Sequence, residues 1–190
     1  MRLAYATITW GGVVGHPVGV TSVKDLFYLA HGSTETAVTE IGGVGYTGIE
    51  IFDGGLMEWK DRPDAFRRLL SASGVQLVGV YSGANFIYPD ILDDELWRIE
   101  QAAALAEEFG AEVLTVGGGA KRAAGTTDAD YEGLAVGLDR VVEIAKRHGL
   151  LAAYHPHLTT IVEHADQVRR WPWRPRMAAC ASSDRNVYSG

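Results

Sequence analysis

The chain has little cysteine, no long hydrophobic run and a deficit of positive charge. Its one cysteine, Cys180, excludes an intramolecular disulfide and is typical of a reducing compartment. No apolar stretch approaches the roughly 18 residues that suggest a membrane span, and the N-terminus lacks the pattern of a signal peptide. Acidic residues (24) outnumber lysine and arginine (17), and the formal charge of −7 argues against sequence-independent binding of nucleic acid. We therefore expect a cytoplasmic protein with neither a membrane nor a nucleic-acid partner.

The charge is unevenly distributed along the chain. Residues 169–190 contain five arginines and one acid, whereas residues 1–168 contain 12 basic and 23 acidic residues. Two prolines and two tryptophans within residues 171–175 end any helix, and the residues after them show neither a helical nor a strand period. We expect a domain at residues 1–168 followed by an irregular basic tail at 169–190, which is either naturally disordered or translated out of frame.

A unit that recurs four times is the most informative feature that the chain does have. Each unit consists of a glycine that closes a helix, an apolar run and a polar or glycine-rich exit, and the units occupy residues 45–55, 74–83, 110–119 and 149–157. A further strand is expected ahead of them at residues 3–11. Strands that alternate with helices form a parallel sheet of βα units. The sequence therefore predicts an α/β fold of the (β/α)8 TIM-barrel type, a partial barrel with about five of the eight units.

Helix-end signals mark the segments between these strands. Ser33 is a suitable N-cap, Pro63 suits a first turn, and an acidic cluster at residues 93–95 favours a helix start there. Thr127 precedes the segment with the clearest helical period. A fifth helix is expected soon after Thr160.

In a barrel of this kind, the working residues lie at the C-terminal ends of the strands and in the loops after them. Alternate residues of a strand share a face, so Glu50 points away from Ile49 and Ile51. A carboxylate in an apolar strand costs free energy unless it has a partner. Glu50 is therefore either functional or salt-bridged. The same rule selects Trp10, Asp53, Tyr81, Ser82, residues 117–122, His155 and His157.

His155 and His157 form the strongest local signal. Both imidazoles fall on one face of an extended segment, and Pro156 stiffens the backbone between them. Neutral imidazole binds divalent metals and also acts as an acid or base near neutral pH. A hard or borderline ion needs carboxylates as well, and Glu163 is the nearest candidate in sequence. The alternative is that His155 is a core residue with a partner and His157 a residue at a helix entry.

The glycine-rich loop at residues 117–125 resembles an anion cradle, to which Lys121 and Arg122 add positive charge. It lacks the spacing of a P-loop or of a dinucleotide fingerprint. A βα loop with a solvated Lys-Arg pair is the alternative. Trp10 and Tyr81 could stack on a sugar or polyol, or they could serve packing.

Four segments together resemble a known family: residues 7–10, 45–50, 117–119 and 154–163. They are similar to the xylose-isomerase-like barrels, the group of sugar phosphate isomerases and epimerases that includes the inosose (2-keto-myo-inositol) dehydratases. The resemblance covers roughly residues 3–168, and the dehydratase-like branch is the most similar. It implies a divalent ion such as Mn²⁺, Co²⁺ or Mg²⁺ that polarises the carbonyl of a ketose or ketopolyol while an acid–base group moves a proton.

The resemblance also implies roles for individual residues. His155 would be a metal ligand with Glu163, while Glu50 and His157 would serve catalysis. The substrate, a small sugar or polyol, would contact Trp10, Tyr81, Lys121 and Arg122. In this family the remaining ligands, an Asp, a His and a Glu, come from strands six to eight, and no matching run is found after residue 168. We therefore expect an incomplete site and no turnover by this chain alone.

The expected function is that of a sugar or polyol isomerase or epimerase. Two alternatives remain open. One is a lyase of the inosose dehydratase type, as in inositol catabolism. The other is a non-catalytic barrel fragment that self-associates into a homo-oligomer through open sheet edges.

Overall fold

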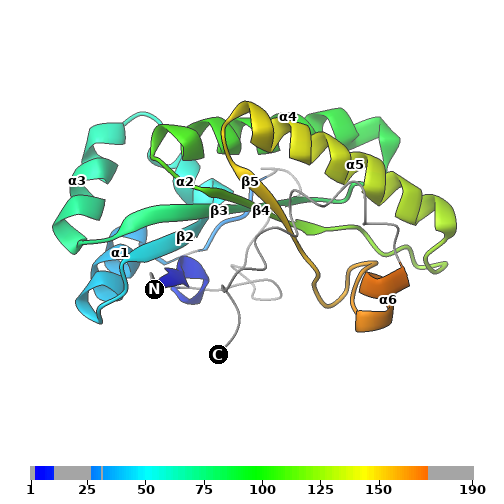
Figure 1. Cartoon of the computed structure of the whole chain (residues 1–190), viewed down its shortest axis with the longest axis horizontal. Coiled ribbons are helices and arrows are strands. Elements are labelled where there is room, and N and C mark those ends of the chain that lie inside the picture. The colour runs from blue at the N-terminus through cyan, green and yellow to red at the C-terminus, as the bar shows by residue number, and fades with distance from the viewer. Residues whose placement is uncertain (1–2, 11–26, 31, 171–190) are drawn as a thin grey trace.

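The computed structural model describes residues 3–10, 27–30 and 32–170, and the basic tail predicted at residues 169–190 lies almost entirely outside this part (Figure 1). The described elements alternate strand and helix along the chain. In order they are β1 (Ala4–Ala6), a 3-10 helix η1 (Thr7–Thr9), α1 (Thr34–Gly43), β2 (Gly48–Phe52), α2 (Asp53–Met57), α3 (Pro63–Ser73), β3 (Gln76–Ala84), α4 (Pro89–Glu108), β4 (Val113–Gly118), α5 (Asp128–Arg147), β5 (Leu151–His155) and α6 (Ala165–Arg170).

The five strands form one parallel sheet in the order β1-β2-β3-β4-β5, so each strand pairs with its neighbour in sequence. Helices α4 and α5 pack side by side over one face of the sheet (Figure 1). This sequential order is that of a βα barrel. The predicted α/β fold with about five units of a TIM barrel is therefore confirmed.

Local end signals account for most helix boundaries. The Ser33 hydroxyl accepts a hydrogen bond from the Thr36 N–H (3.2 Å) at the start of α1. Thr127 forms a capping box with Asp130 at the start of α5. Gly74 ends α3 in the left-handed conformation (φ 67°), which a residue with a Cβ adopts only with strain.

Three helix boundaries differ from those expected. Helix α4 begins at Pro89 rather than near Asp93, because proline suits the first turn of a helix. Glu95 therefore lies within the helix, and its carboxylate accepts a hydrogen bond from the Asn85 N–H in the preceding loop. Helix α2 begins at Asp53, which had been expected only as a strand exit. The helix expected soon after Thr160 starts at Ala165.

Strand alternation divides the sheet into two faces. The apolar residues Ile49 and Ile51 of β2 are buried against the helices. Each such buried side chain stabilises the fold by about 1.5–3 kcal/mol. The intervening residues share the opposite face, called the inner face below. It carries Glu50 on β2, Tyr81 on β3, Thr115 on β4 and His155 on β5. In the described part, no helix is long and apolar enough to cross a membrane.

Candidate active site

Glu50 lies on the inner face and is half-buried. Its carboxylate accepts a hydrogen bond from the Thr115 hydroxyl (2.8 Å). Burial raises the pKa of Glu50, and the Thr115 hydrogen bond offsets part of that increase. No lysine or arginine among the described residues pairs with this carboxylate. Within the described part, Glu50 is therefore not salt-bridged. A partly buried carboxyl with a raised pKa is suited to proton transfer.

Tyr81, His155 and His157 lie in a row at the C-terminal end of the sheet. The Tyr81 ring meets His155 edge to face, with 5.7 Å between ring centroids, and the His155 and His157 rings are 5.8 Å apart. Burial and the neighbouring His157 lower the pKa of His155, so its ring is neutral at pH 7. His155 is only partly buried and keeps an exposed surface, and His157 precedes the start of α6 by eight residues. The alternative interpretation of the two histidines is therefore not seen in the described part: His155 is not a core residue, and His157 does not lie at the start of a helix.

Glu163 pairs with Lys121 rather than with the histidines. Its Oε2 lies 2.5 Å from Lys121 Nζ, and its Oε1 accepts a hydrogen bond from the Thr159 N–H (3.3 Å). The hydrogen bond from Lys121 and then that from Thr159 lower the pKa of Glu163. The described residues contain no group of three or more potential metal-ligating side chains. His155 and His157 thus offer two imidazole donors, which is part of a ligand set.

The glycine-rich loop after β4 does not present a free anion cradle. The Gly119 and Ala120 N–H groups donate to the backbone carbonyls of Ala84 and Asn85 (3.0 Å each). Arg122 pairs with Asp130 (2.8 Å) and lies over the Tyr88 ring at 4.8 Å. Together with the Lys121–Glu163 pair, this leaves both cations of the loop engaged with protein partners.

Trp10 is held apart from the other candidates. Its indole N–H donates to the Glu40 carboxylate on α1 (2.7 Å), and its ring meets Tyr5 edge to face at 5.9 Å. These partners belong to α1 and β1, whereas the histidines lie at the end of β5 and just after it. The structure therefore brings together Glu50, Tyr81, His155 and His157, but not Trp10.

Asp53 and Ser82, also selected by the strand-end rule, are buried and face each other. The Ser82 hydroxyl donates to Asp53 Oδ2 (2.5 Å), and Arg98 of α4 pairs with the same oxygen (3.1 Å). Burial raises the pKa of Asp53 to about 6, against the opposing effects of Arg98 and the hydrogen bonds. Tyr28 donates its backbone N–H to Asp53 Oδ1 (2.6 Å). The sequence contains no periodicity or motif around Tyr28 that indicates this position.

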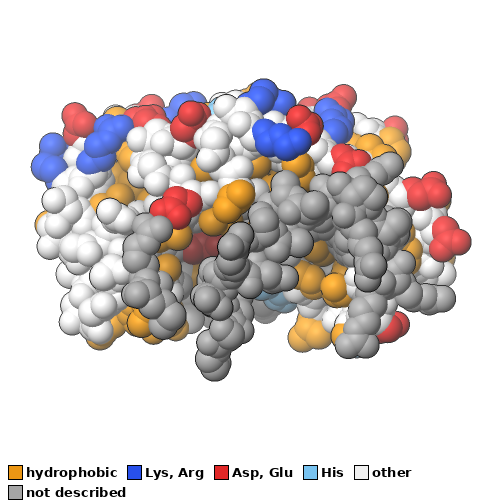
Figure 2. Space-filling view, in the orientation of Figure 1, with side chains coloured by type: hydrophobic (Ala, Val, Ile, Leu, Met, Phe, Trp, Pro, Cys, Tyr) orange, Lys and Arg blue, Asp and Glu red, His pale blue; other side chains and the backbone are white. Residues whose placement is uncertain are grey.

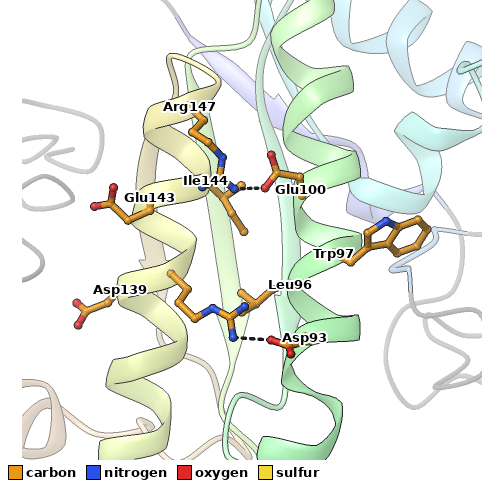
Figure 3. Close-up of a pocket in the computed structure, with 9 residues that line it drawn as sticks. Asp93, Leu96, Trp97, Glu100, Asp139, Glu143, Ile144 and Arg147 are labelled. Carbon is orange, nitrogen blue, oxygen red and sulfur yellow. Dashed lines mark hydrogen bonds and ion pairs between the residues drawn. The ribbon is translucent and has the colours of Figure 1, made fainter.

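A groove of about 450 Å³ lies elsewhere, between α4 and α5. Charged side chains of both signs gather along the top of the molecule, the side on which α4 and α5 lie (Figure 2). The groove runs between α4 and α5 and is crossed by the Arg140–Asp93 and Arg147–Glu100 ion pairs (Figure 3). It is on the face of the sheet opposite Glu50 and the histidines, so it is not the candidate active site.

Sequence comparison finds a curated relative of this chain. An inosose dehydratase of Geobacillus kaustophilus (strain HTA426) is 26% identical over 153 residues, which cover 74% of this chain and 48% of the relative. The chain thus spans about half the length of that curated relative.

Solved structures of low sequence identity share the fold. A probable 3-DHS dehydratase, AsbF of Bacillus anthracis, superposes with a TM-score of 0.66 (14% identity, 90% of this chain and 57% of that one). A xylose isomerase-like TIM barrel protein from Mycobacterium smegmatis in complex with magnesium gives 0.62 (15% identity, 89% and 59%). A D-psicose 3-epimerase from Clostridium cellulolyticum H10, solved with D-tagatose, gives 0.57 (13% identity, 81% and 52%).

A model of one family extends over most of the described sheet. It matches residues 38–171, from α1 to the end of α6, and so includes every strand after β1 together with the loops that carry the candidate residues. This chain therefore belongs to the xylose isomerase-like TIM barrel family.

Proposed function

We propose that this chain belongs to an enzyme that isomerises or epimerises a sugar or polyol by moving a proton next to a carbonyl group. The observation that carries the proposal is the position of Glu50. It is a half-buried carboxyl with a raised pKa on the inner face of the sheet, which it shares with Tyr81 and His155.

Glu50 is the proposed acid–base group. Its raised pKa makes it a stronger base than an exposed carboxylate, and it removes the proton from the carbon beside the carbonyl. The Thr115 hydroxyl, which donates to Glu50 Oε2, orients the carboxylate. His157 is exposed on the neighbouring loop and is the proposed second acid–base group, which returns a proton to the substrate.

A divalent metal ion fits part of this arrangement. His155 would supply an imidazole nitrogen, and its lowered pKa keeps that ring neutral and available as a ligand. A bound ion would polarise the substrate carbonyl as a Lewis acid. Glu163, which was expected as a further ligand, is proposed instead to hold the loop of His157 through its pair with Lys121.

Tyr81 is the best placed of the four residues expected to contact substrate, because its ring lies beside His155. Lys121 and Arg122 stand at the same end of the sheet but are each engaged in an ion pair. Trp10 remains a candidate only for the part of the site nearest β1.

Dehydration is the second candidate reaction. The curated relative at 26% identity is an inosose dehydratase, and elimination of water from a ketopolyol starts with the same removal of a proton beside the carbonyl. The two reactions differ in the step after proton removal, since a hydroxyl group leaves in one case and a proton returns in the other.

Deuterium exchange tests the shared step. We expect the purified chain with Mn²⁺ in D₂O to exchange the hydrogen beside the carbonyl of 2-keto-myo-inositol or D-fructose, as followed by proton NMR. Exchange requires only the base and a bound ketone, so it is more sensitive than turnover. Glu50→Gln should slow it by about 100-fold or more, whereas Glu143→Gln on the exposed surface of α5 should not. Equal exchange in wild type and Glu50→Gln would refute the role of Glu50.

A further inference from the structure

Tyr28 is clamped onto the C-terminal end of β2 through its backbone. Its N–H donates to Asp53 Oδ1 (2.6 Å), and its carbonyl accepts from the Gly54 N–H (2.9 Å). Asp53 is itself fixed, because it is fully buried and bonded to Ser82 (2.5 Å) and Arg98 (3.1 Å). The Tyr28 backbone is therefore held by a buried side chain that two other residues fix in place.

The Tyr28 ring reaches over the inner face. It meets Tyr81 edge to face, with 5.7 Å between centroids and an interplanar angle of 88°, and it packs beside Phe52 at 6.0 Å. A Cβ added to Gly83 would lie 2.8 Å from the Tyr28 hydroxyl oxygen, and one added to Gly117 would lie 1.9 Å from that of Tyr81. The absence of side chains at these two glycines therefore makes room for the two phenols.

The positions of these glycines bring the two hydroxyl groups together. Gly83 of β3 and Gly117 of β4 are partners in the strand register, and His155 of β5 is the next partner after Gly117. The two phenol hydroxyls therefore stand over adjacent strands, next to the His155 ring. No hydrogen bond between either hydroxyl and another described residue is found, and the contacts of the two phenols with each other and with His155 are made by their rings.

The chemistry of this surface is polar but uncharged. Burial raises the pKa of both Tyr28 and Tyr81, so both phenols keep their protons at neutral pH. The nearby guanidinium of Arg98 is engaged by Asp53, and Lys121 and Arg122 are paired with Glu163 and Asp130. The described surface thus presents two neutral O–H donors and no free cation for a phosphate group.

We propose that Tyr28 is a substrate-contact residue. Its hydroxyl and that of Tyr81 donate hydrogen bonds to neighbouring oxygens of an uncharged polyhydroxylated ketone, which lies on the inner face beside His155. Asp53 is the positioning residue that sets Tyr28 in place. The proposal rests on the proposed function and adds to it a contact residue and a preference for substrates without phosphate.

The test compares binding by wild type and Tyr28→Phe, measured as dissociation constants from NMR titration with 2-keto-myo-inositol. The substitution keeps the ring packing and removes only the hydroxyl, so the melting temperature should stay the same. We expect binding to weaken about 5- to 20-fold, as for loss of one hydrogen bond. Tyr46→Phe is the matched control, because Tyr46 precedes β2 at the opposite end of the sheet and contacts Tyr5. It should bind as wild type does.

The outcomes separate this proposal from the proposed function. Equal affinity in wild type and Tyr28→Phe would overturn the assignment of Tyr28 while leaving Glu50 as the base. No binding of 2-keto-myo-inositol or D-fructose by wild type would overturn both. Tighter binding of D-fructose 6-phosphate than of D-fructose would overturn the preference for an uncharged substrate.

Discussion

At the scale of single residues, two arginine–aspartate pairs on α4 show how burial changes the contribution of a charge. Arg98 and Asp53 are buried, with side chains 4% and 0% exposed, and their nearest atoms are 3.1 Å apart. Asp93 pairs with Arg140 of α5 at 2.7 Å, with side chains 86% and 48% exposed. The two distances are similar, but water screens the second pair and not the first. Loss of the buried pair should therefore cost more free energy of unfolding than loss of the exposed one.

Arg98→Met should lower the free energy of unfolding by about 3–5 kcal/mol, because it leaves the Asp53 carboxylate buried without its cation. Arg140→Met, the matched exposed change, should cost less than about 1 kcal/mol. Urea denaturation followed by circular dichroism measures both. A loss of similar size in the two variants would show that the buried pair contributes no more than the exposed one.

At the scale of elements, the loops after β3, β4 and β5 are joined into a continuous hydrogen-bonded belt. The Gly119 N–H donates to the Ala84 carbonyl (3.0 Å), and the Ile161 N–H donates to the Gly119 carbonyl (3.1 Å). The belt begins at Phe86, a buried residue in the left-handed conformation (φ 63°), which costs free energy for an aromatic residue. It ends on the loop that carries His157.

Glu95 of α4 maintains the unusual conformation at Phe86. Its carboxylate accepts from the Asn85 backbone and side-chain N–H groups (2.8 Å each) and from the Phe86 N–H (3.2 Å). This role explains why Glu95 is buried although it was expected only as an acidic residue at a helix start.

Glu95→Gln should lower the free energy of unfolding by about 1–3 kcal/mol, because an amide replaces one acceptor oxygen with a donor and leaves a buried N–H without a partner. Thermal unfolding would detect the loss, with Glu143→Gln on the surface of α5 as the control. If Glu95→Gln unfolded at the wild-type temperature, the loop would not depend on this carboxylate.

At the scale of the whole molecule, a histidine joins the two longest helices of the described part. His148, which comes directly after α5, places Nε2 2.8 Å from Glu100 and Nδ1 2.7 Å from Glu107, both on α4. Burial lowers the pKa of His148, but the hydrogen bonds and charges of Glu107 and Glu100 raise it by more, and the net direction is upward. Arg147 also pairs with Glu100.

The stability of the whole fold should therefore depend on pH through His148. A histidine whose folded pKa is raised contributes fully below its unfolded pKa of about 6.5, and that contribution is lost as pH rises through the folded value. We expect the wild-type melting temperature to fall as pH rises above about 6.5, and His148→Gln to reduce this fall. Melting curves from pH 5.5 to 8.5 measure it, and identical curves for the two proteins would exclude the contribution. The control is His164→Gln, because the hydrogen bonds of His164 are made by its backbone: its N–H donates to the Gln167 side chain, and its carbonyl accepts from the Gln167 and Val168 N–H groups.

Local sequence was sufficient for the strands, the parallel order and the helix starts at Ser33, Pro63 and Thr127. Apolar periodicity and capping depend on residues a few positions apart, so their physics can be read from the chain itself. The same holds for the side of the strand on which Glu50 lies, because alternation places it opposite Ile49.

Only the tertiary structure decided which polar residues are free to act. Lys121 pairs with Glu163 across 42 positions, and Asp53 is buried against Arg98 across 45. Tyr28 comes to the inner face through a bond to Asp53, 25 residues away. These partners meet because the strands are stacked in register and the helices cover one face, and the spacing of residues along a chain does not encode such contacts. The sequence by itself therefore determined the barrel-type sheet and its candidate end, while packing determined which side chains remain available there.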